Sequence, residues 1–375
     1  MGDSRAKPGI GTGGTAPDEG VPPFEPHPWI LGPHAQTIVA RYLNWPGPRL
    51  PSTYAEVDVG GGDRVAVLDS TPGGWAEGDP IAILVHGLSG SARSPYIVRV
   101  ARRLAEAGVR VVRMNLRGAG AGFGSSRSFY HSGLTGDLRA VAERANRLGP
   151  GSPIALVGFS LGANLVLKLA AEAADRAVPG LDCVVAANPP LDLNATCRQI
   201  RERSNRVYDR NFVASLLGEV RRLRSTFPEP SPIDLTAVAS LYEFDEAYTA
   251  PSNGFRDAAD YHARSSAGPL VSQIRVPGLV IHAEDDPFIP PESIRQVQFP
   301  PQLALELIPQ GGHLGYFGRY PWLGDRRWLD ARIFIWLTNR WSLGRPASRL
   351  KLREHDRLRP NIKEAGRLCR KAGCS

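Results

Sequence analysis

Cysteine is scarce in this sequence, and its placement excludes two kinds of cross-link. The four cysteines, Cys183, Cys197, Cys369 and Cys374, have neither C-x-x-C spacing nor the Cys/His spacing of a zinc site. A disulfide framework and a bound metal are therefore not expected, and a reducing cytoplasm fits this composition.

Long apolar stretches are also missing. No run approaches the roughly 18 apolar residues of a membrane-spanning helix, and the N-terminus lacks the apolar core of a signal peptide. Ala6 stands where an N-myristoylation motif requires Ser or Thr. We therefore predict a cytoplasmic protein without a membrane span or lipid anchor.

Most of the chain has no net charge, although the whole sequence carries +8. From Arg340 to Ser375 there are 11 Lys/Arg and 3 Asp/Glu, which leaves 45 − 11 = 34 basic and 37 − 3 = 34 acidic residues elsewhere. The excess lies in a predicted basic C-terminal extension, residues 342–375. Such a tail could contact an anionic membrane or nucleic acid, but charge runs more often only solvate, so neither partner is favoured.

The remaining sequence predicts one α/β domain over residues 21–341, preceded by a disordered tail over residues 1–20 that is rich in Gly, Pro and Thr. Apolar residues within 21–51 indicate that this segment packs on the domain. Short apolar runs bounded by turn residues predict strands, which cover Tyr54–Val59, Arg64–Asp69, Ile81–Val85, Val109–Met114, Ile154–Val157, Leu181–Ala187, Val276–Ala283 and Leu303–Pro309. Helices are predicted over Pro95–Ala107, Thr135–Leu148, Leu161–Ala174 and Arg327–Trp341. This alternation is typical of a mostly parallel central sheet flanked by helices.

One long interval, about residues 190–269, interrupts the alternation after the strand that ends near Asn188. It includes a helical stretch around Arg198–Arg224. Because ligands bind at the carboxyl ends of strands in open α/β sheets, we interpret this insertion as a helical lid. Arg203, Arg206 and Arg210 fall on one helical face and could select an anionic substrate, although nearby acidic residues favour a solvated face.

The sequence Gly158-Phe-Ser160-Leu-Gly162 lies between a predicted strand and a predicted helix. This arrangement is typical of a nucleophile elbow, in which the serine occupies a sharp, strained turn. Glycine is needed on either side because a Cβ there would crowd the turn. Ser160 is therefore a candidate nucleophile, provided that a base and an acid can reach it.

A histidine and a carboxylate occur where such a nucleophile needs them. His313 lies in a Gly-rich loop directly after the last predicted strand and is the candidate base. Asp286 follows the penultimate strand and precedes a proline, so it is the preferred acid, with Asp285 and then Glu284 as alternatives. The order Ser160, Asp286, His313 is that of α/β-hydrolases.

The oxyanion of such a reaction needs two backbone N–H donors. Leu161 directly follows Ser160 at a helix N-terminus, where the helix dipole also favours negative charge. Leu88 lies in the loop His86-Gly-Leu-Ser-Gly after the strand Ile81–Val85. We expect these two N–H groups to form the oxyanion hole, and we expect His86 to be a structural hydrogen-bonding residue.

Several short segments, some of which contain the motifs above, together match the pattern of a known family: Pro28–Thr37, His86–Gly90, Met114–Gly118, Tyr130–Gly133, Gly158–Asn164, Asn188–Asp192 and Tyr248–Phe255. Together they make the chain, from about residue 22 to 341, resemble the YheT-like (EMB8-like) family of α/β-hydrolases. The resemblance implies an α/β-hydrolase fold and a Ser–Asp–His triad, which falls on Ser160, Asp286 and His313. It also implies ester, acylglycerol or phospholipid substrates.

The leading hypothesis is a serine carboxylesterase or lipase-like enzyme that forms an acyl-enzyme on Ser160 and acts on a small acyl ester or lipid. The first alternative is acyl transfer to an alcohol or thiol through the same triad. A catalytically idle binding module is the other alternative, but no triad member is missing. This chemistry requires neither a metal nor an organic cofactor.

Overall fold

The computed structural model describes residues 20–42, 50–228 and 232–343. The predicted disordered tail, apart from residue 20, and the basic extension, apart from residues 342 and 343, lie outside these ranges. Among the described residues no helix combines the length and the apolar character needed to cross a membrane.

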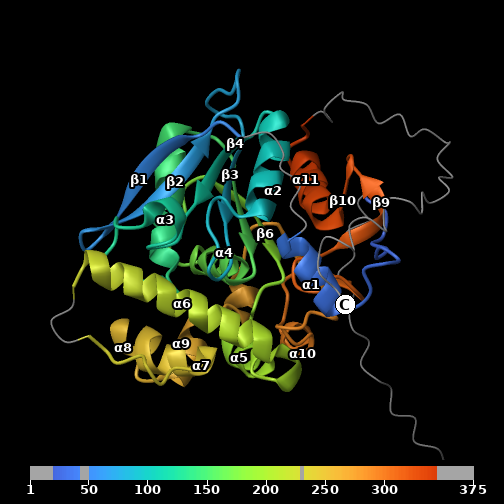
Figure 1. Cartoon of the computed structure of the whole chain (residues 1–375). Helices are drawn as coiled ribbons and strands as arrows, with labels where there is room; N and C mark the ends of the chain where they lie inside the picture. The colour runs from blue at the N-terminus through green and yellow to red at the C-terminus, as the bar shows by residue number, and fades with distance from the viewer. Residues whose placement is uncertain (1–19, 43–49, 229–231, 344–375) are drawn as a thin grey trace, which may run out of the picture. The chain divides into compact units, whose positions relative to one another are not determined.

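An eight-stranded sheet has the order β1-β2-β4-β3-β5-β6-β7-β8 (Figure 1). The pairs β1·β2 and β2·β4 are antiparallel, and every other neighbouring pair is parallel, so the predicted mostly parallel sheet is confirmed. The strands span Thr53–Gly60 (β1), Asp63–Ser70 (β2), Ile81–Val85 (β3), Arg110–Met114 (β4), Ile154–Phe159 (β5), Leu181–Ala187 (β6), Gly278–Ala283 (β7) and Leu303–Ile308 (β8).

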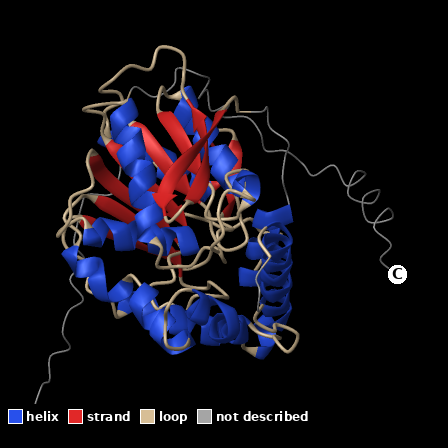
Figure 2. Ribbon diagram, turned by 90° about the vertical axis from the view of Figure 1, so that its left-hand side faces the viewer, coloured by secondary structure: helices blue, strands red, loops and turns tan. Residues whose placement is uncertain are grey.

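Helices cover both faces of this sheet (Figure 2). Helices α2 (Pro95–Glu106) and α11 (Trp328–Arg340) pack on one face, whereas α3 (Thr135–Leu148) and α4 (Leu161–Glu172) pack on the other. Strand β3 is fully buried, and its residues alternate between the two cores, which explains why its sequence is apolar throughout.

The helical insertion connects β6 to β7 and lies below the sheet in the view of Figure 1. Its helices are α5 (Leu193–Ile200), α6 (Arg206–Thr226), α7 (Leu241–Phe244), α8 (Ala250–Ser252) and α9 (Ala258–Ser265), with a π turn at Asp245–Thr249 and 3₁₀ turns at Arg203–Asn205 and Gly268–Gln273. The single helical stretch expected over residues 198–224 is wrong in one respect. The α-helix is interrupted over residues 201–205, where the side-chain amide of Asn205 donates to the carbonyls of Gln199 and Pro287.

Some elements escaped sequence prediction. They are α1 (Pro33–Tyr42), α10 (Glu292–Arg295), a 3₁₀ turn at Gly120–Gly122 and the hairpin of β9 (Phe317–Trp322) with β10 (Asp325–Arg327). The segment before α1 packs on the domain as expected: Pro26 bridges to Gly318, and the Trp328 indole donates to the Pro22 carbonyl.

Candidate active site

Ser160 occupies a strained turn between β5 and α4, with φ 53° and ψ −122°. Few non-glycine residues adopt such a backbone conformation. The flanking glycines make this turn sterically feasible. A Cβ on Gly158 would lie 2.2 Å from the Gly162 carbonyl oxygen, and a Cβ on Gly162 would lie 2.4 Å from the Val85 carbonyl oxygen. The steric role predicted for both glycines is confirmed.

His313 lies between Ser160 and Asp286 and contacts both. Its Nε2 is 2.9 Å from Ser160 Oγ, and its Nδ1 is 2.8 Å from Asp286 Oδ2. Because a carboxylate can only accept, Nδ1 carries the proton, and Nε2 accepts from the serine hydroxyl. The three residues follow β5, β7 and β8, whose carboxyl ends meet at one edge of the sheet.

The three acidic candidates after β7 have different partners. Asp286 is buried and also accepts the N–H groups of Phe288 and Ile289. Asp285 accepts the Gly312 N–H, whereas Glu284 pairs with Arg295 on the surface. Among the described residues, Asp286 is thus the carboxylate that reaches His313.

Electrostatics favour the ionised form of Asp286. Burial acts to raise the pKa of this carboxyl, but the adjacent His313 and the backbone N–H donors hold the pKa below its usual value. Burial raises the pKa of Asp285. The pKa of Asp286 is therefore lowered, whereas the pKa of its neighbour Asp285 is raised.

Asn188 and Tyr316 support Asp286 from behind. The Asn188 amide donates to Asp286 Oδ2 at 2.6 Å, and the Tyr316 hydroxyl donates to Asn188 Oδ1 at 2.9 Å. Both residues are fully buried, and Asn188 has a φ of 47°. The sequence analysis assigned neither residue a role. The position of Asn188 at the carboxyl end of β6, between the strands β5 and β7 that lead to Ser160 and Asp286, could have indicated one.

Helix α1 holds the His313 loop in place. The Thr37 hydroxyl accepts the His313 N–H at 2.9 Å and donates to the Pro33 carbonyl at 2.7 Å. Gly312, with φ +58°, packs so closely that a Cβ would lie 2.4 Å from the Pro33 oxygen. The Pro28–Thr37 segment thus acts on the site through the candidate base.

Two backbone N–H groups beside Ser160 are available to a ligand. In the loop after β3, the Gly87 N–H donates to the Tyr96 hydroxyl and the Ser89 N–H donates to the Tyr130 hydroxyl. Within the described part of the chain, the N–H groups of Leu88 and Leu161 have no protein acceptor. Both residues line the same cavity as Ser160. The predicted oxyanion donors are thus neighbours of the nucleophile and free to bind.

His86 is buried beneath this loop. Its Nε2 accepts the Leu116 N–H, so its Nδ1 donates to the Gly87 carbonyl. Burial lowers the pKa of His86 to about 4. The ring is neutral and fully engaged with backbone, as expected for a structural residue.

Ser160 opens into a cavity of about 840 Å³. The sheet side contributes Leu88, Leu161 and His313, and the helical insertion contributes much of the opposite wall through Leu193, Phe212 and Leu216, among others. The wall is mainly apolar. The cavity therefore suits an apolar ligand group next to a polar reacting centre.

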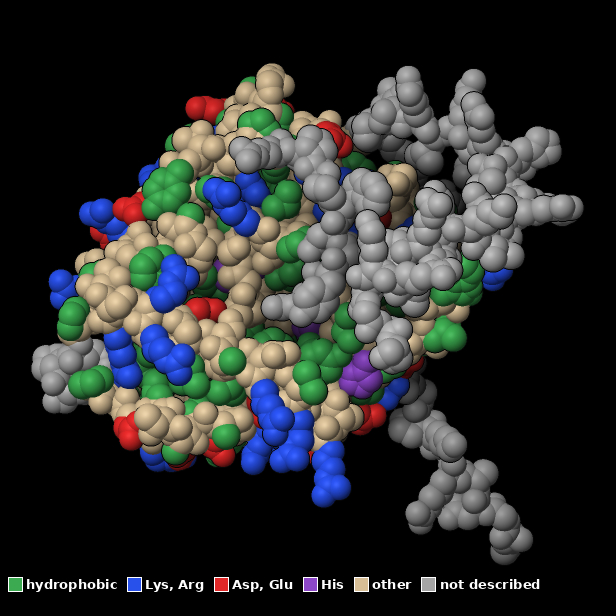
Figure 3. Space-filling model, viewed as in Figure 1, with side chains coloured by type: hydrophobic (Ala, Val, Ile, Leu, Met, Phe, Trp, Pro, Cys, Tyr) green, Lys and Arg blue, Asp and Glu red, His purple; other side chains and the backbone are tan. Residues whose placement is uncertain are grey.

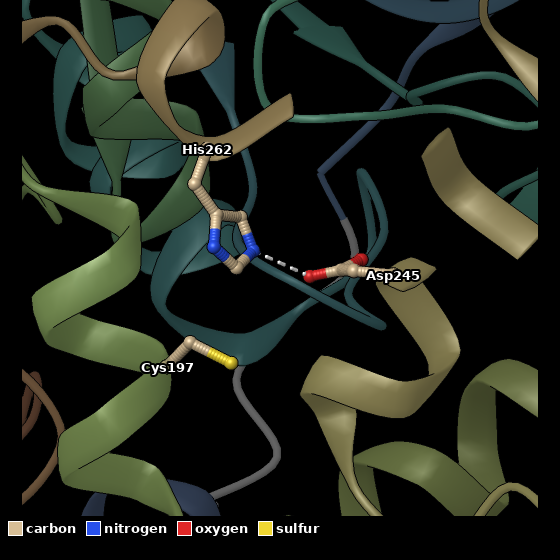
Figure 4. Close-up of side chains that lie close together, drawn as sticks. All are labelled: Cys197, Asp245 and His262. Atoms are coloured by element: carbon tan, nitrogen blue, oxygen red, sulfur yellow. Dashed lines mark hydrogen bonds and ion pairs between the residues drawn. The ribbon is translucent and has the colours of Figure 1, made fainter. Parts of the chain in front are cut away.

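A buried Cys–Asp–His cluster lies in the insertion part of the cavity wall (Figure 4). The potential ligand atoms of Cys197, Asp245 and His262 lie within 4.8 Å of one another, a donor set that could hold a metal ion. His262 Nε2 is already hydrogen-bonded to Asp245 at 2.9 Å, and burial raises the pKa of the Cys197 thiol. The hydrogen bond joins α9 to the π turn, and the Cys197 side chain of α5 lies beside it, so we interpret the cluster as structural.

The model of the alpha/beta hydrolase fold family matches residues 80–320. The Escherichia coli (strain K12) protein YheT, which carries a provisional esterase name, is 33% identical over 81% of this chain and 90% of its own length. The chain belongs to the YheT-like family of α/β-hydrolases. The α/β-hydrolase fold predicted from the sequence is therefore confirmed.

More distant relatives agree with this assignment. The monoacylglycerol lipase of Saccharomyces cerevisiae is 27% identical over 64% of the YheT-like chain, and the match spans 55% of that lipase. Among solved structures, the Pyrococcus furiosus esterase Pf2001 is 15% identical with a TM-score of 0.53, covering 87% of this chain and all of that one. This last likeness concerns the fold.

Proposed function

We propose that this YheT-like hydrolase is a serine esterase that cleaves carboxylic esters through an acyl-enzyme on Ser160. The observation that carries the proposal is the continuous hydrogen-bond chain from Ser160 through His313 to Asp286. It lies where a cavity gives the serine hydroxyl access to a ligand. The esterase and lipase names of the relatives point to the same chemistry.

In the first half-reaction Ser160 Oγ attacks the ester carbonyl carbon, and its proton passes to His313 Nε2. Asp286 keeps the proton on Nδ1 and stabilises the imidazolium that forms. The N–H groups of Leu88 and Leu161 donate to the oxyanion of the tetrahedral intermediate. As this intermediate collapses, His313 returns the proton to the departing alcohol, and the acyl group remains on Ser160.

In the second half-reaction a water molecule attacks the acyl carbon while His313 takes its proton. The second tetrahedral intermediate collapses with release of the carboxylic acid, and the proton returns to Ser160 Oγ. The helical insertion acts as a lid that places apolar side chains around the acyl group. An apolar acyl ester, including a lipid ester, is the substrate class that this wall favours.

Replacement of Ser160 tests the proposal. Ser160→Ala should lower kcat for p-nitrophenyl acyl esters at least roughly a thousandfold, since the nucleophile is lost while the fold is kept. Ser225→Ala, at the exposed end of α6, is the control and should behave like the wild type. A fluorophosphonate probe should label the wild type and spare Ser160→Ala. Wild-type turnover by a folded Ser160→Ala protein would refute the esterase assignment.

A further inference from the structure

Several exposed apolar side chains belong to two neighbouring parts of the chain, the segment leading into α1 with α1 itself and the start of α6. Trp29, Leu31 and Ile38, from the segment before and within α1, are 80%, 69% and 47% exposed, and Val207 at the start of α6 is 67% exposed. They make up four of the seven large apolar residues exposed in the described part of the chain. Clustering of this kind, unlike scattered exposure, marks an interaction surface.

Helices α1 and α6 are neighbours. The His34 ring stacks on the Tyr208 ring with centroids 5.7 Å apart, and His34 Nδ1 is 3.2 Å from the Tyr208 hydroxyl. Ile38 and Val207 are exposed to solvent and also line the cavity that holds Ser160. The cavity therefore opens to the surface between α1 and the start of α6.

Three arginines adjoin this opening in sequence, since Arg203 and Arg206 directly precede the lining residues Ser204 and Val207 and Arg210 follows one turn later. Arg203, Arg206 and Arg210 are exposed, and Arg206 and Arg210 are one helical turn apart on the exposed face of α6 that also carries Val207. Within the described residues, none of the three forms an ion pair. Of the two nearby acidic residues, Asp209 turns inward and accepts the Leu241 N–H, whereas Glu202 is exposed beside Arg203, so the three arginines leave a net positive charge. Lys and Arg side chains accordingly project together from the corner where α5 meets α6 (Figure 3).

We propose that this corner docks on an anionic lipid surface. The mouth surface consists of Trp29, Leu31, Ile38, Arg203, Arg206, Val207 and Arg210. Its apolar side chains would enter the boundary between headgroups and acyl chains, while the arginines pair with lipid phosphates. Docking in this way aligns the cavity opening with the membrane. The inference goes beyond ester cleavage, because docking requires no reaction at Ser160.

The arginines are tested by vesicle binding of the full chain. Wild-type protein should co-float with phosphatidylglycerol/phosphatidylcholine vesicles and bind far less to pure phosphatidylcholine. The triple variant Arg203→Gln, Arg206→Gln, Arg210→Gln should bind the anionic vesicles roughly a hundredfold more weakly, at about fivefold per charge. Turnover of a soluble short-chain ester should not change.

A charge-matched control separates the mouth surface from net charge. Arg147, Arg176 and Arg275 are exposed and precede β5, β6 and β7, so they lie at the opposite, amino ends of the strands. Changing these three arginines to glutamine removes the same charge and should leave vesicle binding within about twofold of the wild type.

The apolar contribution is tested with Trp29 and Leu31. The double variant Trp29→Ser, Leu31→Ser should bind anionic vesicles roughly tenfold more weakly, whereas Tyr54→Ser, Tyr320→Ser, which removes exposed aromatics elsewhere, should not. Brominated lipid should quench Trp29 fluorescence on binding, so the quenching should shrink in Trp29→Phe.

Three results would overturn the proposal. The first is that the wild type does not bind anionic vesicles, and the second is that both arginine triple variants lose binding equally. The third is that the protein binds RNA or polyglutamate as tightly as vesicles, with no effect of the Trp29→Ser, Leu31→Ser double variant. Ser160→Ala should bind vesicles like the wild type, so failure of docking and failure of the esterase proposal are distinguishable.

Discussion

At the residue scale, adjacent carboxyls after β7 have separate tasks. Asp286 faces His313, whereas Asp285 accepts a backbone N–H from the loop that carries His313. The preference for Asp286 in the sequence rested on its spacing before Pro287. Which neighbour turns toward the histidine depends on the turn after β7, and that geometry is visible only in the fold.

Asparagine substitutions should separate these two tasks. Asp286→Asn should lower kcat roughly a thousandfold or more, because an amide neither fixes the Nδ1–H tautomer of His313 nor stabilises its imidazolium. Asp285→Asn keeps an oxygen that can accept the Gly312 N–H and should remain within about tenfold of the wild type. Steady-state kinetics of both purified variants provide the measurement. Equal losses would contradict the assignment of Asp286.

The lowered pKa of Asp286 predicts how stability depends on pH. A carboxyl whose folded-state pKa is depressed stabilises the fold above its unfolded pKa, about 3.9, and this stabilisation is lost as the pH falls through the folded value. The stability of the wild type relative to Asp286→Asn should therefore decline as the pH falls from 6 to 3. Urea unfolding across this range measures it, and a difference that grows toward acid pH would contradict the shift.

At the element scale, α1 positions the candidate base across 276 residues of sequence. The apolar content of residues 21–51 predicted that this segment packs on the domain. It did not predict the helix, because α1 has only ten residues and prolines and glycines surround it. The central parallel strands were predictable because burial on both sheet faces leaves uninterrupted apolar runs. The contacts of α1 with the His313 loop depend on tertiary structure, so they were not predictable from the sequence.

Thr37 offers a direct test of this contact. Thr37→Val removes the acceptor of the His313 N–H and leaves this donor without a partner. If the loss of about 1–3 kcal/mol falls on the position of His313, kcat should decrease about fivefold to a hundredfold. KM should change less than kcat, since the Thr37 hydroxyl is engaged with the His313 N–H and the Pro33 carbonyl. Thr37→Ser keeps the hydroxyl and should restore most of the activity. A valine variant with unchanged kcat would argue against a positioning role.

At the scale of the whole molecule, a buried ion cluster joins the antiparallel edge of the sheet to α3. Arg117 pairs with Asp137 through two nitrogens and with Asp63 through a third contact. All three side chains are at most 13% exposed. The sequence motif Met114–Gly118 contains Arg117 and supported family membership, but a sequence does not identify the carboxylates that meet it.

Arg117→Met should destabilise the protein by about 3–5 kcal/mol, because it leaves two buried carboxylates without their cation. The exposed pair of Arg64 and Glu56 provides the control: Arg64→Met should cost less than about 1 kcal/mol. Guanidinium unfolding of both variants gives the two free energies. A loss for Arg117→Met as small as that of the control would show that the cluster is dispensable.

The contact of α1 with the His313 loop also has a consequence during biosynthesis. The ribosome makes α1 near the beginning of the chain and His313 near the end, so α1 must wait for a partner that emerges 276 residues later. A nascent chain can already have formed the elbow at Ser160 while no base is present. Under the proposed mechanism, the growing polypeptide therefore carries an unactivated serine until His313, which follows β8, has been translated.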